Sequence, residues 1–146
     1  MMKVESLGHV VLKVTDLERA EQFYAGLLGM KVCARFDDQG YNMTFFTLGN
    51  HHDLALLKVT GEDATGEQAI GLHHVAFRIG DSMDQLREAK ARLEEADVEF
   101  DPIDHDVTKS LYLNDPDGNT LELYVDVSDG WRNDPQRIAQ VGPLEI

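Results

Sequence analysis

The chain has 146 residues, with 27 acidic and 13 basic side chains and a formal net charge of −14 at pH 7. This charge repels phosphate backbones and anionic lipid surfaces, so we expect neither nucleic acid nor a membrane as a partner. Apolar runs stay far below the roughly 20 residues of a membrane-spanning helix, and residues 1–6 lack the apolar stretch of a secretion signal. We therefore expect a cytoplasmic protein. The only cysteine, Cys33, can form no internal disulfide, and we expect it to be a small core residue.

Two segments share one pattern, GHVVLKV at residues 8–14 and LHHVAFRI at residues 72–79. Large apolar residues alternate with smaller or charged ones in both, which predicts a strand with one apolar face. A histidine stands at the entrance of each strand, His9 in the first and His74 in the second, on the less apolar face. Two strands of one design that each present a histidine suggest a shared site.

A helix follows the first strand. Thr15 and Glu18 have the spacing of a capping box, with Asp16 as the competing cap, and Gly29 ends the helix. Three strands are predicted next, at residues 31–36, 41–48 and 53–59.

The same order recurs after residues 61–67, a small, polar segment that we interpret as a linker. Ser82 and Gln85 have capping-box spacing at the start of the second helix. Strands are then predicted near residues 98–100, 110–113 and 120–125, with a strong turn at residues 115–118 before the last one.

Two copies of one βαβββ module therefore account for most of the chain and predict an α+β fold. We expect a single domain over residues 1–146, with module one at about 5–60 and module two at about 70–127. The tail, residues 128–146, is expected to pack on the surface or against a partner subunit.

A carboxylate in the last predicted strand indicates the chemistry. Glu122 lies between Leu121 and Leu123, so it points to the face opposite the apolar set, where a cavity is expected. An unpaired buried carboxylate costs several kcal/mol, so it needs a metal, an arginine or several donors. His9 and His74 favour the metal. Two imidazoles and one carboxylate form the facial triad typical of non-haem iron(II), with open positions for substrate and oxygen.

The paired modules and these residues resemble the vicinal oxygen chelate superfamily of glyoxalase I, fosfomycin and bleomycin resistance proteins and type I extradiol dioxygenases. The resemblance covers residues 5–127. The segment HDVTKSLYLNDPDGNTLELY at residues 105–124, with HHDLAL at residues 51–56, is similar to small one-domain catechol-type dioxygenases. It implies a curved mixed sheet around a metal cavity, and an enzyme that opens a catechol-like ring with O2.

The resemblance also implies roles for individual residues. His9, His74 and Glu122 would bind Fe(II), with Mn(II) as a possible substitute, and Tyr112 would donate to a substrate oxygen. A hairpin with one bulged residue around residues 115–118 would independently place Tyr112 directly across from Glu122. His105 is the candidate acid/base. The family motif commonly has His-Gly where this chain has His105-Asp106, so the extra carboxylate could change the loop geometry or the proton affinity of the histidine.

Two alternatives stay open. Ala55 stands at the position equivalent to Glu122 in module one and cannot supply the fourth, carboxylate ligand of a glyoxalase-like site, although Asp53 on the same face could. A glyoxalase- or epimerase-like lyase or isomerase using Zn(II) or Ni(II) as a Lewis acid would work without oxygen, and a bleomycin-resistance-type ligand-binding protein would hold no metal.

We expect His51 and His52 to be supporting or structural residues. The modules can pair within a chain or between two chains, and a homodimer or higher homo-oligomer is expected either way.

Overall fold

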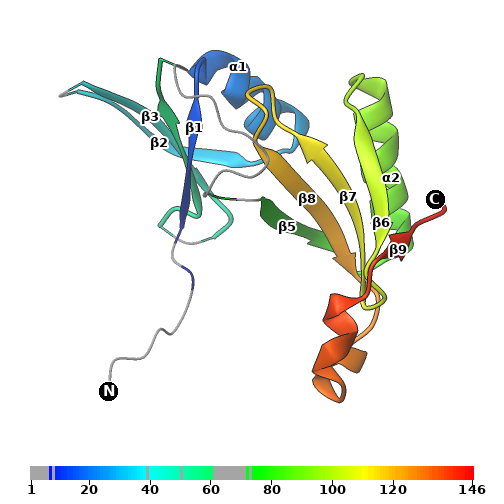
Figure 1. Ribbon diagram of the computed structural model, residues 1–146. Helices are drawn as coiled ribbons and strands as arrows, with labels where there is room; N and C mark the ends of the chain where they lie inside the picture. The colour runs from blue at the N-terminus through cyan, green and yellow to red at the C-terminus, as the bar shows by residue number, and fades with distance from the viewer. Residues whose placement is uncertain (1–6, 8, 39, 50, 61–71, 73) are drawn as a thin grey trace, which may run out of the picture. The chain divides into compact units, whose positions relative to one another are not determined.

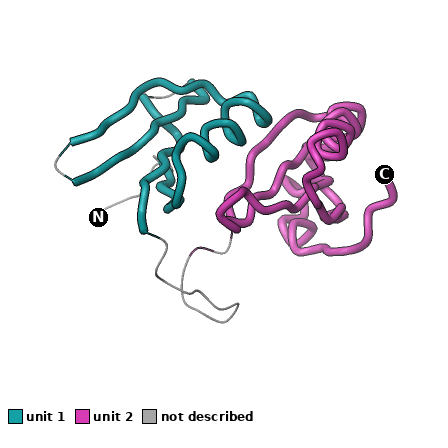
Figure 2. Tube along the Cα trace, turned by 90° about the horizontal axis from the view of Figure 1, so that it is seen from above, with its two compact units in different colours: residues 1–69 teal, residues 70–146 magenta. Residues whose placement is uncertain are grey.

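The computed structural model describes residues 7, 9–38, 40–49, 51–60, 72 and 74–146. The chain divides into two compact units, Met1–Ala69 (unit 1) and Ile70–Ile146 (unit 2) (Figure 2). The predicted linker at residues 61–67 and the predicted start of the first strand at Gly8 lie outside the described residues. Each unit has the element order βαβββ and one mixed sheet, so the predicted α+β class is confirmed (Figure 1).

Unit 1 places its first strand beside its last. Its sheet has the order β1-β4-β3-β2, in which β1 and β4 are parallel and the other neighbours are antiparallel. The helix begins as α-helix and continues as a π-helix. The elements are β1 (Val10–Val14), α1 (Leu17–Glu21), η1 (Gln22–Leu27), β2 (Lys31–Asp38), β3 (Tyr41–Thr47) and β4 (Leu54–Lys58).

Two details of unit 1 differ from the leading expectations. Asp16, the competing cap, is the N-cap of α1, because its carboxylate accepts a hydrogen bond from the Arg19 amide at 3.1 Å. The prediction that Cys33 is a core residue is wrong, since Cys33 is exposed. The reason is that β2 is an edge strand of its sheet, and all of its residues except Val32 are exposed.

Unit 2 repeats the arrangement and adds the C-terminal segment. Its sheet has the order β5-β8-β7-β6-β9, with β5 and β8 parallel. The elements are β5 (Val75–Gly80), α2 (Met83–Glu95), β6 (Phe100–Asp104), β7 (Thr108–Asn114), β8 (Thr120–Asp126), the 3₁₀ helices η2 (Gly130–Arg132) and η3 (Pro135–Ala139), and β9 (Gly142–Pro143).

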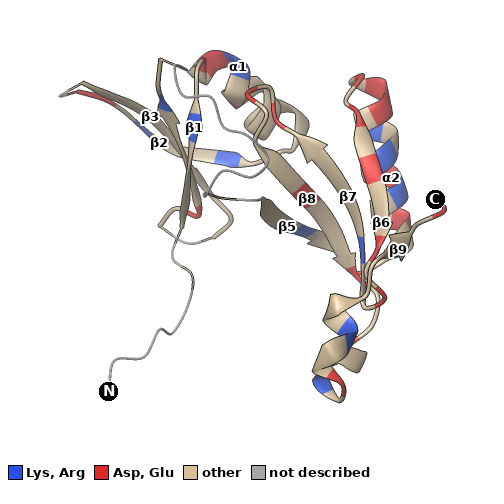
Figure 3. Ribbon diagram, viewed as in Figure 1, with Lys and Arg blue, Asp and Glu red and all other residues tan. Residues whose placement is uncertain are grey.

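The helix α2 covers one face of the unit 2 sheet (Figure 1). The predicted capping box is present, with the Ser82 side chain accepting from the Gln85 amide and the Gln85 side chain accepting from the Ser82 amide. Leu86 and Leu93 are buried on the inner side, whereas charged residues occupy the outer side (Figure 3). This amphipathic pattern drives the packing of α2 on β5, β7 and β8.

The strand after α2 starts later than predicted. Residues 98–100 were expected to form it, but β6 begins at Phe100. The Val98 amide donates to the Leu93 carbonyl at 2.9 Å, and Asp97 has a positive φ of 55°. These residues satisfy the last carbonyls of α2 and are therefore used to end the helix.

The turn between β7 and β8 sets the register of the two strands. Gly118 has a φ of 84°, its amide donates to the Asp115 carbonyl, and the Asp115 carboxylate accepts from the amides of Asp117 and Asn119. The resulting ladder pairs Tyr112 with Glu122, as predicted. The predicted bulged residue lies in the turn itself, where Gly118 adopts the left-handed conformation. Hairpins that combine a turn with a left-handed glycine have this arrangement.

No helix among the described residues is long and apolar enough to cross a membrane.

Replacing Gly118 tests the role of this turn. A Cβ at Gly118 would have nothing within 4 Å, so the cost of Gly118→Ala comes from the left-handed backbone alone. We expect a loss of about 1–2 kcal/mol in the free energy of unfolding, measured by urea denaturation. Gly118→Asn should lose less, because asparagine tolerates this conformation. Equal losses in the two variants would contradict this explanation.

Candidate functional site

Glu122 is a buried acid in the middle of β8. Its neighbours Leu121 and Leu123 are buried on the opposite face of the strand, and Glu122 itself is 8% exposed. Its Oε1 atom accepts a hydrogen bond from the Ser110 hydroxyl at 2.6 Å. Ser110 is fully buried on β7, so this bond partly compensates the desolvation of the carboxylate and fixes its orientation.

His74 lies beside the other oxygen of this carboxylate. It immediately precedes β5, the parallel neighbour of β8, and its Nε2 atom is 3.3 Å from Glu122 Oε2. The parallel pairing of Ala76 with Glu122 brings the entrance of β5 next to the middle of β8. The predicted association of His74 with Glu122 is therefore present in unit 2.

Tyr112 completes a cluster around the carboxylate. It stands opposite Glu122 in the β7–β8 ladder, and its ring centroid is 5.5 Å from that of His74. Burial raises the pKa of Tyr112 to about 12, and hydrogen bonding to the Glu122 carboxylate adds to the rise. The phenol keeps its single proton at neutral pH and donates it to one acceptor at a time.

His105 extends the cluster from the loop between β6 and β7. Its Nε2 atom is 3.1 Å from the Tyr112 hydroxyl, and its Nδ1 atom is 2.9 Å from the Gln140 carbonyl oxygen. The structure thus brings together four of the five predicted site residues, namely His74, His105, Tyr112 and Glu122.

The fifth predicted residue, His9, belongs to unit 1, so its meeting with His74 and Glu122 stays a prediction. His9 immediately precedes β1, and its ring lies against that of His52 with centroids 4.2 Å apart. The Nδ1 atoms of His51 and His52 are 2.7 Å apart. Desolvation lowers the pKa of His52, and the charges of the His9 and His51 rings lower it further. The neutral form of His52 is favoured beside His9.

The pair formed by His74 and Glu122 fits a divalent metal ion. Two donor atoms held at right angles, each about 2.1 Å from such an ion, lie about 3 Å apart, close to the observed 3.3 Å. Ser110 engages the other carboxylate oxygen, as groups around metal ligands commonly do. Within the described residues no three His, Cys, Asp or Glu side chains form a metal-binding group. A metal ion bound by this pair would need a further ligand, the role predicted for His9.

Unit 1 has no carboxylate at the position equivalent to Glu122. Val11 pairs with Ala55 in the parallel ladder of unit 1 as Ala76 pairs with Glu122 in unit 2, so the predicted equivalence of Ala55 and Glu122 holds. One carboxylate oxygen of Asp53, the alternative ligand, accepts a hydrogen bond from the Leu48 amide at 2.6 Å. Asp53 therefore helps to close the loop between β3 and β4.

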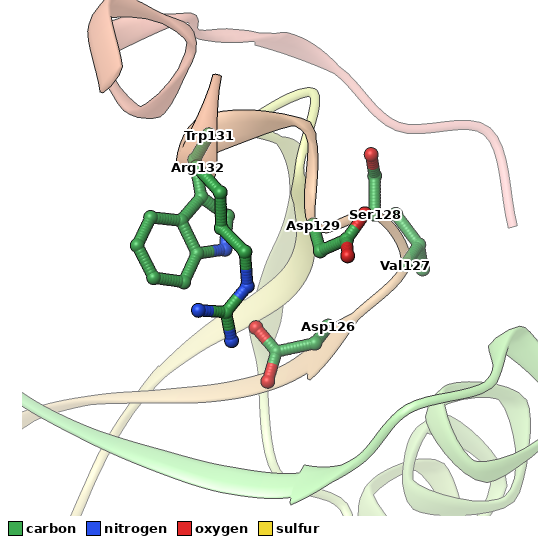
Figure 4. Close-up of a pocket in the computed structure, with 6 residues that line it drawn as sticks. All are labelled: Asp126, Val127, Ser128, Asp129, Trp131 and Arg132. Carbon is green, nitrogen blue, oxygen red and sulfur yellow. The ribbon is translucent and has the colours of Figure 1, made fainter. Parts of the chain in front are cut away.

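Ser110 and Gln140 were missed as site residues. Ser110 could have been recognised, because it is a small polar residue on the same face of β7 as Tyr112. Gln140 contributes only a backbone carbonyl from a distant segment, and no side-chain pattern in the sequence signals such a contact. A pocket of about 430 Å³ at the end of β8 is lined by none of the predicted site residues (Figure 4).

The chain is similar to known enzymes of two classes. The chain is 34% identical over 131 residues to biphenyl-2,3-diol 1,2-dioxygenase 2 of Rhodococcus globerulus, covering 86% of this chain and 65% of that protein. It is 28% identical to a lactoylglutathione lyase of Neisseria meningitidis, covering 80% of this chain and 88% of the lyase. The chain thus spans slightly less than two thirds of the dioxygenase.

A solved structure shows the same fold. The glyoxylase/bleomycin resistance protein/dioxygenase domain from Frankia sp. EAN1pec superposes with a TM-score of 0.75 at 23% identity, covering 90% of this chain and 98% of that one. The family pattern itself matches residues 6–123. The chain therefore belongs to the Glyoxalase/Bleomycin resistance protein/Dioxygenase superfamily, the vicinal oxygen chelate proteins.

Proposed function

We propose that this protein is a metal-dependent extradiol-type dioxygenase that opens a catechol-like aromatic ring with O2. The observation that carries the proposal is the cluster of His74, Glu122, Tyr112 and His105 on one unit. Two of these side chains are suited to hold a metal and two to bind and transfer protons. The 34% identity to a biphenyl-diol dioxygenase supports the choice of reaction within the superfamily.

His74 and Glu122, with His9 from unit 1, are the proposed ligands of Fe(II), with Mn(II) as a possible substitute. When bound, the ion supplies open coordination positions for a diol and O2 together with one-electron redox chemistry. Three protein ligands favour this chemistry over a four-ligand Lewis-acid site, because Ala55 lacks a carboxylate. The Ser110 hydroxyl orients Glu122 so that one oxygen faces His74.

Tyr112 binds the substrate through a hydrogen bond, and His105 transfers protons. With a substrate bound, the Tyr112 phenol would donate its single proton to a substrate oxygen in place of Glu122 or His105, and its pKa, raised to about 12, keeps that proton on the phenol. His105 Nε2 is within hydrogen-bond distance of the same hydroxyl, so it can accept or return a proton at that position. Both side chains come from β7 or the loop before it, which holds them in one orientation relative to Glu122.

Reconstitution tests the reaction. The purified protein is loaded anaerobically with Fe(II), mixed with a panel of catechols and exposed to O2, and coloured ring-cleavage product and oxygen uptake are measured. We expect activity, and we expect His74→Ala and Glu122→Gln to lose both stoichiometric metal binding and activity. Glu95→Gln, at an exposed end of α2, is the matched control and should retain both.

Three outcomes would contradict the proposal. The absence of both oxygen uptake and ring-cleavage product across the panel would rule out ring cleavage of these diols. Turnover without oxygen after loading with Zn(II) or Ni(II) would indicate the Lewis-acid lyase or isomerase. Failure to bind any stoichiometric metal would indicate a ligand-binding protein.

Removing the Ser110 hydroxyl tests how Glu122 is held. We expect Ser110→Ala to weaken the binding of Mn(II), measured by titration calorimetry, by about 10- to 100-fold, because groups that orient a metal ligand typically contribute this much. Ser128→Ala removes a hydroxyl that accepts from the Gly130 amide and serves as the control. Unchanged Mn(II) affinity in Ser110→Ala would contradict the proposed role of Ser110.

The acid/base role of His105 predicts a specific kinetic defect. His105→Asn should lower kcat by about 100- to 10,000-fold and remove one limb of the pH–rate profile, because the proton acceptor is lost. Tyr112→Phe should lower kcat while the pH–rate profile keeps that limb. Mn(II) affinity, measured in parallel, should change little in either variant. A pH–rate profile of wild-type shape in His105→Asn would show that another group transfers the proton.

A further inference from the structure

The C-terminal segment, residues 128–146, packs onto the loop that carries His105. Its strand β9 pairs with the end of β6, with Gly142 opposite Asp104. On the other side of the loop, the amides of Val127 and Ser128 both donate to the Val107 carbonyl, at 3.0 and 3.2 Å. The loop is therefore held by the chain that follows β8 at both of its ends.

An ion pair joins the segment to the residue beside His105. Arg137, in η3, donates two hydrogen bonds to the Asp106 carboxylate, Nε to Oδ2 at 2.5 Å and Nη2 to Oδ1 at 2.8 Å. This two-point geometry restricts both distance and direction, which a single contact does not. The Arg137 guanidinium holds the pKa of Asp106 below its usual range, which favours the charged carboxylate in this ion pair.

The backbone at Asp106 has the conformation that the glycine of the family motif would favour. Asp106 has a φ of 64°, and its amide donates to the Asp104 carboxylate at 2.7 Å. Glycine adopts this conformation readily, and aspartate and asparagine tolerate it better than most residues. Asp106 thus keeps the turn that a glycine would form and adds a carboxylate. Backbone conformation alone does not require that carboxylate, whereas the contact with Arg137 uses both of its oxygens.

The same segment determines which nitrogen of His105 carries the proton. A carbonyl oxygen only accepts hydrogen bonds, so the 2.9 Å contact with Gln140 requires a proton on His105 Nδ1. In the neutral ring, Nε2 then has its lone pair directed at the Tyr112 hydroxyl, 3.1 Å away. Gln140 lies three residues after Arg137, and its amide donates to the Arg137 carbonyl at 3.3 Å, which links this residue to the one that forms the ion pair.

We propose that the C-terminal segment is the positioning element of His105: the Arg137–Asp106 ion pair anchors the segment, and the Gln140 carbonyl keeps His105 in the Nδ1–H tautomer with Nε2 facing Tyr112. Arg137 and Asp106 are positioning residues, because they act through His105. The consequence for turnover rests on the proposed dioxygenase function, whereas the tautomer of His105 does not.

The tautomer is tested first, without metal or substrate. Long-range ¹H–¹⁵N spectra of protein with ¹⁵N-labelled histidine, at alkaline pH, report which ring nitrogen is protonated, and His105→Asn assigns the signal. We expect a single Nδ1–H form in the wild type and a mixture with the Nε2–H form in Arg137→Gln, Asp106→Asn and Asp106→Gly. Asp106→Gly is the sharpest variant, because glycine accepts the positive φ and only the carboxylate is lost.

The matched control is Arg132→Gln. Arg132 lies in the same segment, with its guanidinium 4.6 Å from the centroid of the Trp131 ring, at the pocket seen in Figure 4. The Arg132→Gln variant should keep the single Nδ1–H tautomer of His105. Arg137→Lys retains the charge but not the two-point contact and should recover part of the wild-type signal. This variant also covers the case in which Arg137→Gln does not fold.

Turnover is tested second. Arg137→Gln should lower kcat by up to about 100-fold with little change in KM, because a displaced proton acceptor affects the chemical step more than binding. Arg137→Gln should not lower kcat further in the His105→Asn variant or in combination with Asp106→Asn. All three substitutions affect the chemical step through His105, so their effects on kcat should not add.

The outcomes separate this inference from the proposed function. A single Nδ1–H tautomer in Arg137→Gln and Asp106→Gly, or an equal mixture in Arg132→Gln, would overturn the inference whatever the activity. A mixture confined to the Arg137 and Asp106 variants would support it even if no catechol is cleaved. Additive losses of kcat in the combined variants would overturn the route through His105.

Discussion

The burial of the Glu122 carboxylate between β5 and β7 is the interaction on which the rest of the site depends. A charged group in this position is tolerated only if polar atoms surround it, and Ser110 and His74 provide them. These contacts require β5 to be the parallel neighbour of β8 and β7 its antiparallel neighbour, as observed. The parallel pairing of β5 with β8 therefore places the His74 imidazole beside the Glu122 carboxylate, although the two residues lie far apart in the sequence.

The two units have the same strand register but different residues at the position of Glu122. In unit 1 the position equivalent to Glu122 holds Ala55, which is fully buried and packs in the core. Unit 1 also collects three histidine rings, those of His9, His51 and His52, at one end of its sheet. The two units therefore share one backbone framework, whereas only unit 2 has a carboxylate at this position.

The sequence predicted the framework well because the signals were local. Hydrophobic alternation, the capping box at Ser82 and the turn before β8 are each encoded within a few residues, and the turn was sufficient to place Tyr112 opposite Glu122. The errors arose where long-range context overrides local pattern. Cys33 has the pattern of a core residue, but it stands on an edge strand that is exposed along almost its whole length. The C-terminal segment has little periodicity, so neither β9 nor its contact with the His105 loop could be anticipated.

The placement of β9 also has a consequence for association between molecules. Edge strands attract further chains because their backbone donors and acceptors face outward. On β6, Gly142 and Pro143 pair with Asp104 and Ile103, and the Leu144 amide donates to the Pro102 carbonyl. Proline has no amide hydrogen to offer a neighbouring strand. This margin is thus poorly suited to recruit a second copy by strand addition, and trimming residues 142–146 would uncover the backbone donors and acceptors of β6 that β9 now covers.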